Sequence, residues 1–227
     1  MPVDQPPAEC VRLVEQAAPL PDPKNQEAFR RWLEHHKRKS ECARLSEAGW
    51  SSIEKVAEQG RQVRRATFNE GRLAFRIPAV ALERSRDGAV WIRISMDRPT
   101  RVFSAAVAPE TWARLTALDA EARRPPIPLR RDGPSPIGCH GWFVTLEGAE
   151  AKKSWRQDVS ECSTDPNAAA FEYGYELASL AVEHIPECAS AKAKAEAQYA
   201  QAPMDRQKPV WALIYCGGRF SPRTLEG

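Results

Sequence analysis

The sequence predicts an α+β protein in which an N-terminal helical hairpin precedes antiparallel sheet segments with packed helices, all stabilised by disulfides. Apolar residues recur at helical spacing in the first 66 residues and alternate at strand spacing in later segments. Six cysteines occur in 227 residues, and an apolar share of 42% is enough to build a hydrophobic core. These three observations define the expected fold class.

The first segment, residues 1–66, is expected to be helical. Prolines at positions 19, 21 and 23 prevent a helix there, so the main helix should begin near Asn25. Gly49 can end it, and Ser51 or Ser52 can cap a second helix. The apolar stripes of these two helices comprise Phe29, Trp32, Leu33 and His36 on the first, and Ile53, Val56, Ala57 and Val63 on the second.

The second segment, residues 67–123, is expected to hold antiparallel strands and one helix. Alternation of apolar residues at Leu73, Phe75 and Ile77 predicts a strand. Asp87-Gly88 is a tight-turn signal and predicts a hairpin formed by the segments on either side of this turn. A further strand at 101–107 should lead into a helix whose first turn contains Pro109, a residue favoured at that position.

Residues 124–138 are rich in proline and arginine and are expected to form an exposed connector. Such a connector can either separate two independent domains or cross the surface of one, because both routes need an extended polar segment. The sequence leaves these alternatives open.

The last structured segment, residues 139–216, should begin with a β-hairpin that pairs 139–147 with 154–162. This register places Cys139 opposite Cys162, Trp142 opposite Val159 and Leu146 opposite Trp155. A helix capped by Asp165 should follow, then an exposed helix at 189–200 and a final strand at 210–216. Residues 217–227 are expected to be a flexible tail.

Facing Cβ atoms in an antiparallel pair lie roughly 4.5 to 5.5 Å apart, which suits a disulfide between Cys139 and Cys162. The helix between Cys162 and Cys188 is expected to hold those two residues about 30 Å apart. The remaining pairs are then Cys188 with Cys216, and Cys10 with Cys42.

Three disulfides predict an oxidising compartment, so the chain is expected to be periplasmic or secreted, with a cytoplasmic location as the alternative. The N-terminus lacks the apolar stretch of a secretory signal, so an exported chain would be a mature form. No apolar run is long enough to span a membrane, and no Cys-x-x-Cys or His-Glu-x-x-His motif predicts a metal. No cofactor is expected.

The basic charge is concentrated in the first half, with a net charge of +6 for residues 1–138 and −3 for residues 139–227. On the first helix, Arg30, Arg31, Lys37 and Arg38 can contact phosphates, which makes nucleic-acid binding one hypothesis. Glutamates interrupt this basic surface, so a solvated helix face is the simpler interpretation.

Catalytic candidates are few. Adjacent strand residues point to opposite faces, so Cys139 and His140 should not form a dyad. His140 can instead face Glu161 across the hairpin, where a carboxylate would orient it as the base of a hydrolase. A histidine that simply satisfies its hydrogen bonds at the core edge is the plainer alternative. Trp50 and Trp91 are candidate exposed anchors for a partner.

The leading hypothesis is therefore a non-enzymatic exported protein, periplasmic or envelope-associated, that binds a protein or a small molecule. A hydrolase based on His140 and Glu161 is the first alternative. A nucleic-acid-associated protein that uses the basic N-terminal half is the second.

Overall fold

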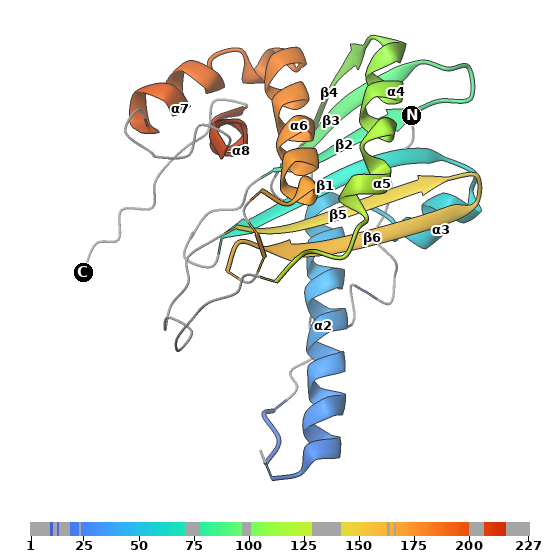
Figure 1. Cartoon of the computed structure of the whole chain (residues 1–227), viewed down its shortest axis with the longest axis vertical. Coiled ribbons are helices and arrows are strands. Elements are labelled where there is room, and N and C mark those ends of the chain that lie inside the picture. The colour runs from blue at the N-terminus through green and yellow to red at the C-terminus, as the bar shows by residue number, and fades with distance from the viewer. Residues whose placement is uncertain are drawn as a thin grey trace.

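A single antiparallel sheet of six strands organises the computed structural model, and helices lie on both of its faces (Figure 1). The structure describes residues 10, 13, 19–22, 24–70, 78–96, 101–128, 142–162, 164–165, 167–199 and 207–216. The strands are β1 (Gln62–Glu70), β2 (Ala79–Arg84), β3 (Val90–Met96), β4 (Arg101–Val107), β5 (Trp142–Glu150) and β6 (Lys153–Ser160). They lie in the order β4-β3-β2-β1-β5-β6, with β4 and β6 at the edges.

Strand β1 joins the two halves of the chain, because it pairs with β2 on one side and with β5 on the other. Strands from before and after the proline-rich connector therefore belong to one sheet. Of the connector itself the structure describes residues 124–128, and Pro128 forms a β-bridge with Thr164. The connector thus links two parts of the same sheet.

Strand β1 is also the main departure from the predicted elements. It begins at Gln62, so Val63 and the other last residues of the predicted helical segment are part of the sheet. The consecutive residues Arg64 and Arg65 hide the strand pattern, because both are buried although they point to opposite faces. Alternation of apolar and polar residues, the usual mark of a strand, is absent there.

The N-terminal helices form where their caps predict. Helix α2 (Gln26–Ala48) is capped by Asn25, whose Oδ1 accepts a hydrogen bond from the backbone N–H of Ala28 at 3.0 Å. It ends at Gly49, whose φ of 65° lies in the left-handed region that glycine adopts readily. Helix α3 (Ile53–Glu58) is capped by Ser52 and packs on β1, β5 and β6.

The hairpin of β2 and β3 turns at Asp87 and Gly88, as predicted. Strand β4 and helix α4 (Pro109–Ala117) also form where expected, followed by the short helix α5 (Asp119–Ala122). Trp112 and Leu115 of α4 are buried against the sheet. The predicted strand around Leu73, Phe75 and Ile77 lies outside the described residues.

The hairpin of β5 and β6 forms in a register two residues away from the predicted one. Val144 faces Val159 and Gly148 faces Trp155, so the predicted pairings of Trp142 with Val159 and of Leu146 with Trp155 are wrong. The cause is a tight two-residue turn at Ala151 and Lys152, which adopt positive φ values of 49° and 63° without any glycine.

A shift of two residues leaves every side chain on its original face. Trp142, Val144 and Leu146 therefore share one face of the hairpin and are buried together. The new register also explains a glycine: a Cβ at Gly148 would lie 2.2 Å from Nε1 of Trp155, so only glycine lets that indole cross the strand. On the opposite face, the Glu147 side chain is buried.

Helix α6 (Ala169–His184) covers the centre of the sheet and is buried along most of its length. It begins after Ala168, later than predicted, because the Asp165 carboxylate bonds the backbone N–H of Asn167 in a preceding turn. The short 3₁₀ helix η1 (Pro186–Cys188) and helix α7 (Ala191–Tyr199) follow.

The predicted final strand is wrong. Residues 208–213 form helix α8 (Lys208–Leu213), which packs against α6 and α7. A short apolar run is compatible with either a buried strand or a buried helix, so its periodicity did not distinguish them.

Candidate interaction site

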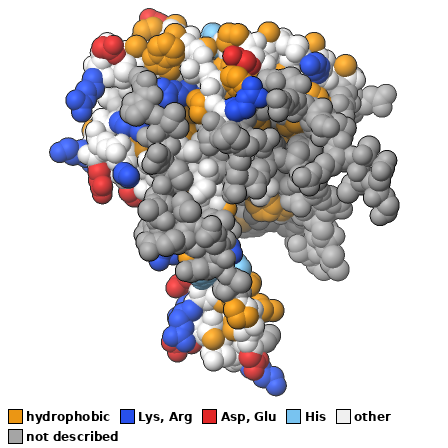
Figure 2. Space-filling view, turned by 180° about the vertical axis from the view of Figure 1, so that it is seen from behind, with side chains coloured by type: hydrophobic (Ala, Val, Ile, Leu, Met, Phe, Trp, Pro, Cys, Tyr) orange, Lys and Arg blue, Asp and Glu red, His pale blue; other side chains and the backbone are white. Residues whose placement is uncertain are grey.

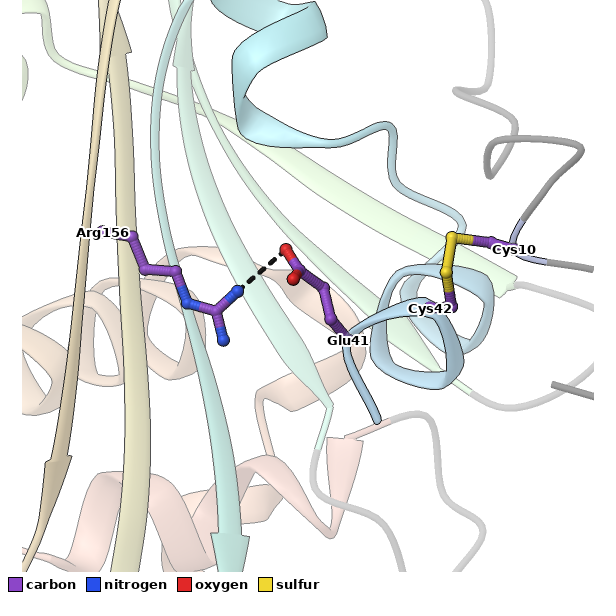
Figure 3. The surroundings of a disulfide bond; sticks show 4 residues. All are labelled: Cys10, Glu41, Cys42 and Arg156. Carbon is purple, nitrogen blue, oxygen red and sulfur yellow. Dashed lines mark ion pairs between the residues drawn. A yellow bond between two sulfur atoms is a disulfide. The ribbon is translucent and has the colours of Figure 1, made fainter. Parts of the chain in front are cut away.

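The second half of helix α2 packs on the sheet. Leu45, Ala48 and Trp50 pack on Ala79 and Ala81 of β2. One turn earlier, the Glu41 carboxylate forms an ion pair with Arg156 of β6 at 2.8 Å (Figure 3). Because β6 is an edge strand, α2 crosses one face of the sheet and its first half extends past the edge (Figure 1). We call residues 26–40 the arm and residues 41–48 the root.

A chain of alternating charges holds the root. Arg156 bonds Asp158 at 3.0 Å as well as Glu41, and its guanidinium lies 4.0 Å from Glu147. Burial alone would lower the pKa of Arg156, but the hydrogen bond to Asp158 and the nearby carboxylates outweigh it and raise that pKa. Arg156 therefore keeps its charge beside the root.

Arg65 continues this chain into the sheet. Its Nε donates to Oε2 of Glu147 at 2.7 Å, and its Nη2 donates to the backbone oxygen of Ser51 at 3.0 Å. The guanidinium also lies over the ring of Trp50, 4.8 Å from its centroid. Trp50 is thus buried at the root, which corrects the prediction of an exposed anchor at this position.

A disulfide between Cys10 and Cys42 adds a covalent link at the root (Figure 3). Cys188 and Cys216 form a second disulfide that ties η1 to the end of α8. Both pairs match the pairing predicted from the sequence. Cys162 is also disulfide-bonded. Cys139 lies outside the described residues, so its pairing with Cys162 remains a prediction.

The arm carries apolar side chains that are partly exposed, and its Trp32 and His36 are half-buried. Phe29 is 37% exposed and Leu33 is 40% exposed, and Leu20 in the segment before the helix is 66% exposed. The Phe29 ring stacks on Trp32 at 5.8 Å, and the Trp32 ring lies 4.0 Å from that of His36. Apolar side chains are visible on the projecting part of the molecule in Figure 2. We call Phe29, Trp32, Leu33 and His36 the stripe.

Phe29 and Trp32 of the stripe point away from the sheet. Successive residues of an α-helix are rotated by about 100°, so Leu45 of the root points between about 120° and 160° away from Phe29, Trp32 and Leu33. Leu45 and Ala48 both pack on β2, and Ala48 points about 100° from Phe29 and about 60° from Leu33. The sheet therefore contacts a side of α2 that is turned by about 100° or more from Phe29 and Trp32.

The predicted phosphate-binding residues all belong to the arm but do not share one face. Arg30, Arg31 and Arg38 are exposed, while the side chain of Lys37 lies outside what the structure describes. By position, Arg30 points about 100° from Phe29, whereas Arg31 and Arg38 point roughly 160° to 180° from it. Arg31 is paired with Glu27 at 3.5 Å. A single basic surface does not result.

Of the predicted catalytic pair, the structure describes Glu161, whereas His140 lies outside the described residues. Oε2 of Glu161 accepts the backbone N–H of Trp142 at 3.0 Å, and Oε1 accepts the Tyr175 hydroxyl at 3.0 Å and Nε2 of Gln207 at 2.5 Å. Burial and the Glu161 charge raise the pKa of Tyr175, which keeps this hydroxyl protonated as a donor. Both carboxylate oxygens thus join strand β5 to α6 and to the residue before α8.

A second buried charge cluster lies on the other face of the sheet and was not predicted. Arg64 bonds Asp119 of α5, with its Nε 3.0 Å from Oδ1 and its Nη2 2.5 Å from Oδ2, and bonds Glu150 at 2.7 Å. The Tyr173 hydroxyl donates to Asp119 at 2.8 Å. These groups join β1, α5 and α6, and they serve the fold.

Within the described ranges, no group of three or more His, Cys, Asp or Glu side chains is placed to hold a metal ion. In the same ranges no helix has the length and apolar character needed to cross a bilayer. Comparisons with protein-family models, with curated proteins and with solved structures found no match. The arm and its stripe are therefore interpreted from their own chemistry.

Proposed function

We propose that the chain is an exported interaction protein of an oxidising compartment, such as a periplasm or cell envelope, and that it acts by binding through α2. In this proposal the cross-linked sheet is the support and the stripe is the recognition surface. The observation that carries it is the position of the stripe on the half of α2 that extends past β6, with Phe29 and Trp32 turned away from the sheet.

Two physical arguments support this proposal. An isolated helix shorter than about 12 to 15 residues is only marginally stable in water. The arm is about this long and extends past the sheet, so a partner that covers it would stabilise it. Large apolar side chains at positions i, i+3 and i+4 are also the pattern with which helices dock their partners, and Phe29, Trp32 and Leu33 have this spacing. The disulfides Cys10–Cys42 and Cys188–Cys216 support the oxidising compartment.

Site-specific photo-crosslinking tests the proposal. A photoreactive phenylalanine analogue placed at position 29 or 33 in the full chain, in the organism that makes it, is expected to yield covalent adducts with one partner. The same analogue at position 31, which is two residues from each site but points to the other side of the helix, is the matched control. Adducts at positions 29 and 33 without adducts at 31 are the expected result.

Two outcomes would contradict the proposal. Equal adduct yields at positions 29 and 31 would indicate random collision rather than a recognition surface. Adducts only within the chain itself would mean that the stripe is covered by another part of the same molecule. Mass spectrometry of the adducts distinguishes both outcomes from a genuine partner.

A further inference from the structure

Strand β4 has an open edge. The Ser85 N–H donates to the Ala89 oxygen at 2.9 Å, and these two residues continue the ladder of β2 with β3. Hydrogen-bonded pairs alternate along an antiparallel ladder, so the even-numbered residues of β3 bond β4 at its odd-numbered residues. The N–H and C=O groups of Val102, Ser104 and Ala106 therefore point outward. Among the described residues, no backbone group bonds them.

The other edge of the sheet agrees with this alternation but is protected. Carried across β1 and β5, the alternation requires a bond between Trp142 and Glu161, and the Glu161 N–H does donate to the Trp142 oxygen at 3.0 Å. On β6 the backbone groups of Ser154, Arg156 and Asp158 then point outward. Charged residues on an edge strand discourage the addition of another strand, and Arg156 also holds α2 there by its ion pair.

Strand β4 has no such protection. Its sequence from Val102 to Val107 contains no charged residue and no proline, and its ladder with β3 runs without a bulge. Val102 is 40% exposed, and Ser104 and Ala106 are also exposed. Natural sheets guard a long edge strand with a charge, a proline or a bulge, because a bare edge pairs with other strands. The edge of β4 is therefore suited to strand addition.

We propose that this edge pairs with the same edge of a second copy of the chain, with β4 antiparallel to the partner's β4 about a twofold axis through Ser104. The inference is independent of the proposed function of α2. Outward residues must face outward residues to bond, and an axis at Ser104 uses all three on each copy. Val102 then faces the partner's Ala106, and Ser104 faces the partner's Ser104. Each pair can exchange two hydrogen bonds.

The sequence of β4 is complementary to itself in this register. On the face that packs on the core, the half-buried Phe103 faces the partner's Ala105, so a large side chain meets a small one. The one charge in the strand is Arg101, at its start. The two copies of Arg101 lie at opposite ends of the ladder, about 20 Å apart at roughly 3.4 Å per residue, so their repulsion is largely screened. A second copy therefore fits this edge without an unfavourable pair.

The layers of the molecule also continue across such an interface. Helices α4 and α6 lie on one face of the sheet and α2 lies on the other (Figure 1). A twofold axis that joins two strands edge to edge runs perpendicular to the sheet, so each face of one copy continues into the same face of the other. This contact closes after two copies, and the protected β6 edge does not extend it. The expected assembly is a dimer.

Sedimentation velocity of the full chain, with its disulfides intact, tests the proposal. The 25.4 kDa monomer is expected to form a dimer with a Kd on the order of 10 μM, because pairing along one strand buries little area. Ser104→Lys sets like charges opposite each other across the axis and should weaken the dimer at least about tenfold. Ser154→Lys is the matched control, because it makes the same change at an outward residue of β6. It should change the Kd less than about twofold.

A mixture of two variants tests the register itself. Ser104→Glu alone should also weaken the dimer at least about tenfold. Mixed in equal amounts, Ser104→Glu and Ser104→Lys should dimerise at least as well as the parent chain, because opposite charges then face each other across the axis. Ser104 is exposed, so the circular dichroism spectra of both variants should match that of the parent chain.

Three results would overturn the proposal: a chain that stays monomeric at about 100 μM, equal losses for Ser104→Lys and Ser154→Lys, or a mixture that restores no dimer. A chain that stays monomeric would mean that the edge of β4 is covered within the molecule or is taken by a strand of a different protein. Equal losses, or no restoration, would place the contact between copies elsewhere on the surface.

Discussion

Replacement of Asp119 by alanine is expected to destabilise the protein by about 3 to 5 kcal/mol, because it leaves the Arg64 guanidinium buried without its main counter-charge. Arg64 and Asp119 have only 2% and 5% of their side-chain surface exposed. The same change removes the acceptor of the Tyr173 hydroxyl, which burial and the Asp119 charge hold in its protonated form by raising its pKa. Urea unfolding monitored by circular dichroism measures the loss.

Glu150→Gln is the control for this prediction. Glu150 bonds the same guanidinium, but its side chain is 44% exposed and water can replace it. Its loss should cost less than about 1 kcal/mol. A small effect of Asp119→Ala, similar to that of Glu150→Gln, would show that the cluster does not stabilise the contact of β1 with α5.

Replacement of Glu147 by alanine is expected to have a comparable effect on the other face, about 3 to 5 kcal/mol, because it removes the buried carboxylate that bonds Arg65. The consequence should reach α2, since Arg65 also holds Ser51 and Trp50 at the root. Urea unfolding measures the global loss. Amide exchange of the root, residues 41–48, should become faster than the change in global stability alone explains.

Asp158→Ala provides the comparison for Glu147→Ala. Asp158 bonds Arg156 in the same chain of charges, yet it is 59% exposed, so its removal should cost less than about 1 kcal/mol. If Glu147→Ala left the exchange of the root unchanged relative to Asp158→Ala, the chain of charges would not be what anchors α2.

The elements that the sequence predicted correctly are those set by local signals. Helix α2 begins after Asn25 and ends at Gly49 because both caps act within one turn of the helix. The hairpin of β2 and β3 depends on a turn that lies between its own strands. The buried face of α6 follows from its helical periodicity.

The elements that were missed depend on distant partners. Strand β1 contains two adjacent arginines that are buried only because Asp119 and Glu147, 55 and 82 residues further along, neutralise them. The β5 and β6 register depends on a left-handed turn at Ala151 and Lys152, residues that rarely adopt it. Helix α8 was confused with a strand because a short apolar run fits both.

The sequence predicted the residues of the candidate site but not the direction in which they point. Phe29, Trp32 and Leu33 were predicted to form a stripe, and they do, but periodicity alone cannot reveal which neighbour a stripe faces. That information lies in the ion pair of Glu41 with Arg156 and in the packing of Leu45 on β2, both of which are long-range contacts. They show that the side of α2 that packs on the sheet is turned away from Phe29 and Trp32.

Hydrogen exchange along α2 in the free chain measures whether the arm is covered by the rest of the molecule. Amides of residues 30–38 in the arm should exchange at least about a hundredfold faster than those of the root. Equal protection of arm and root in the free chain would contradict this prediction, because the stripe would then already be buried within the molecule.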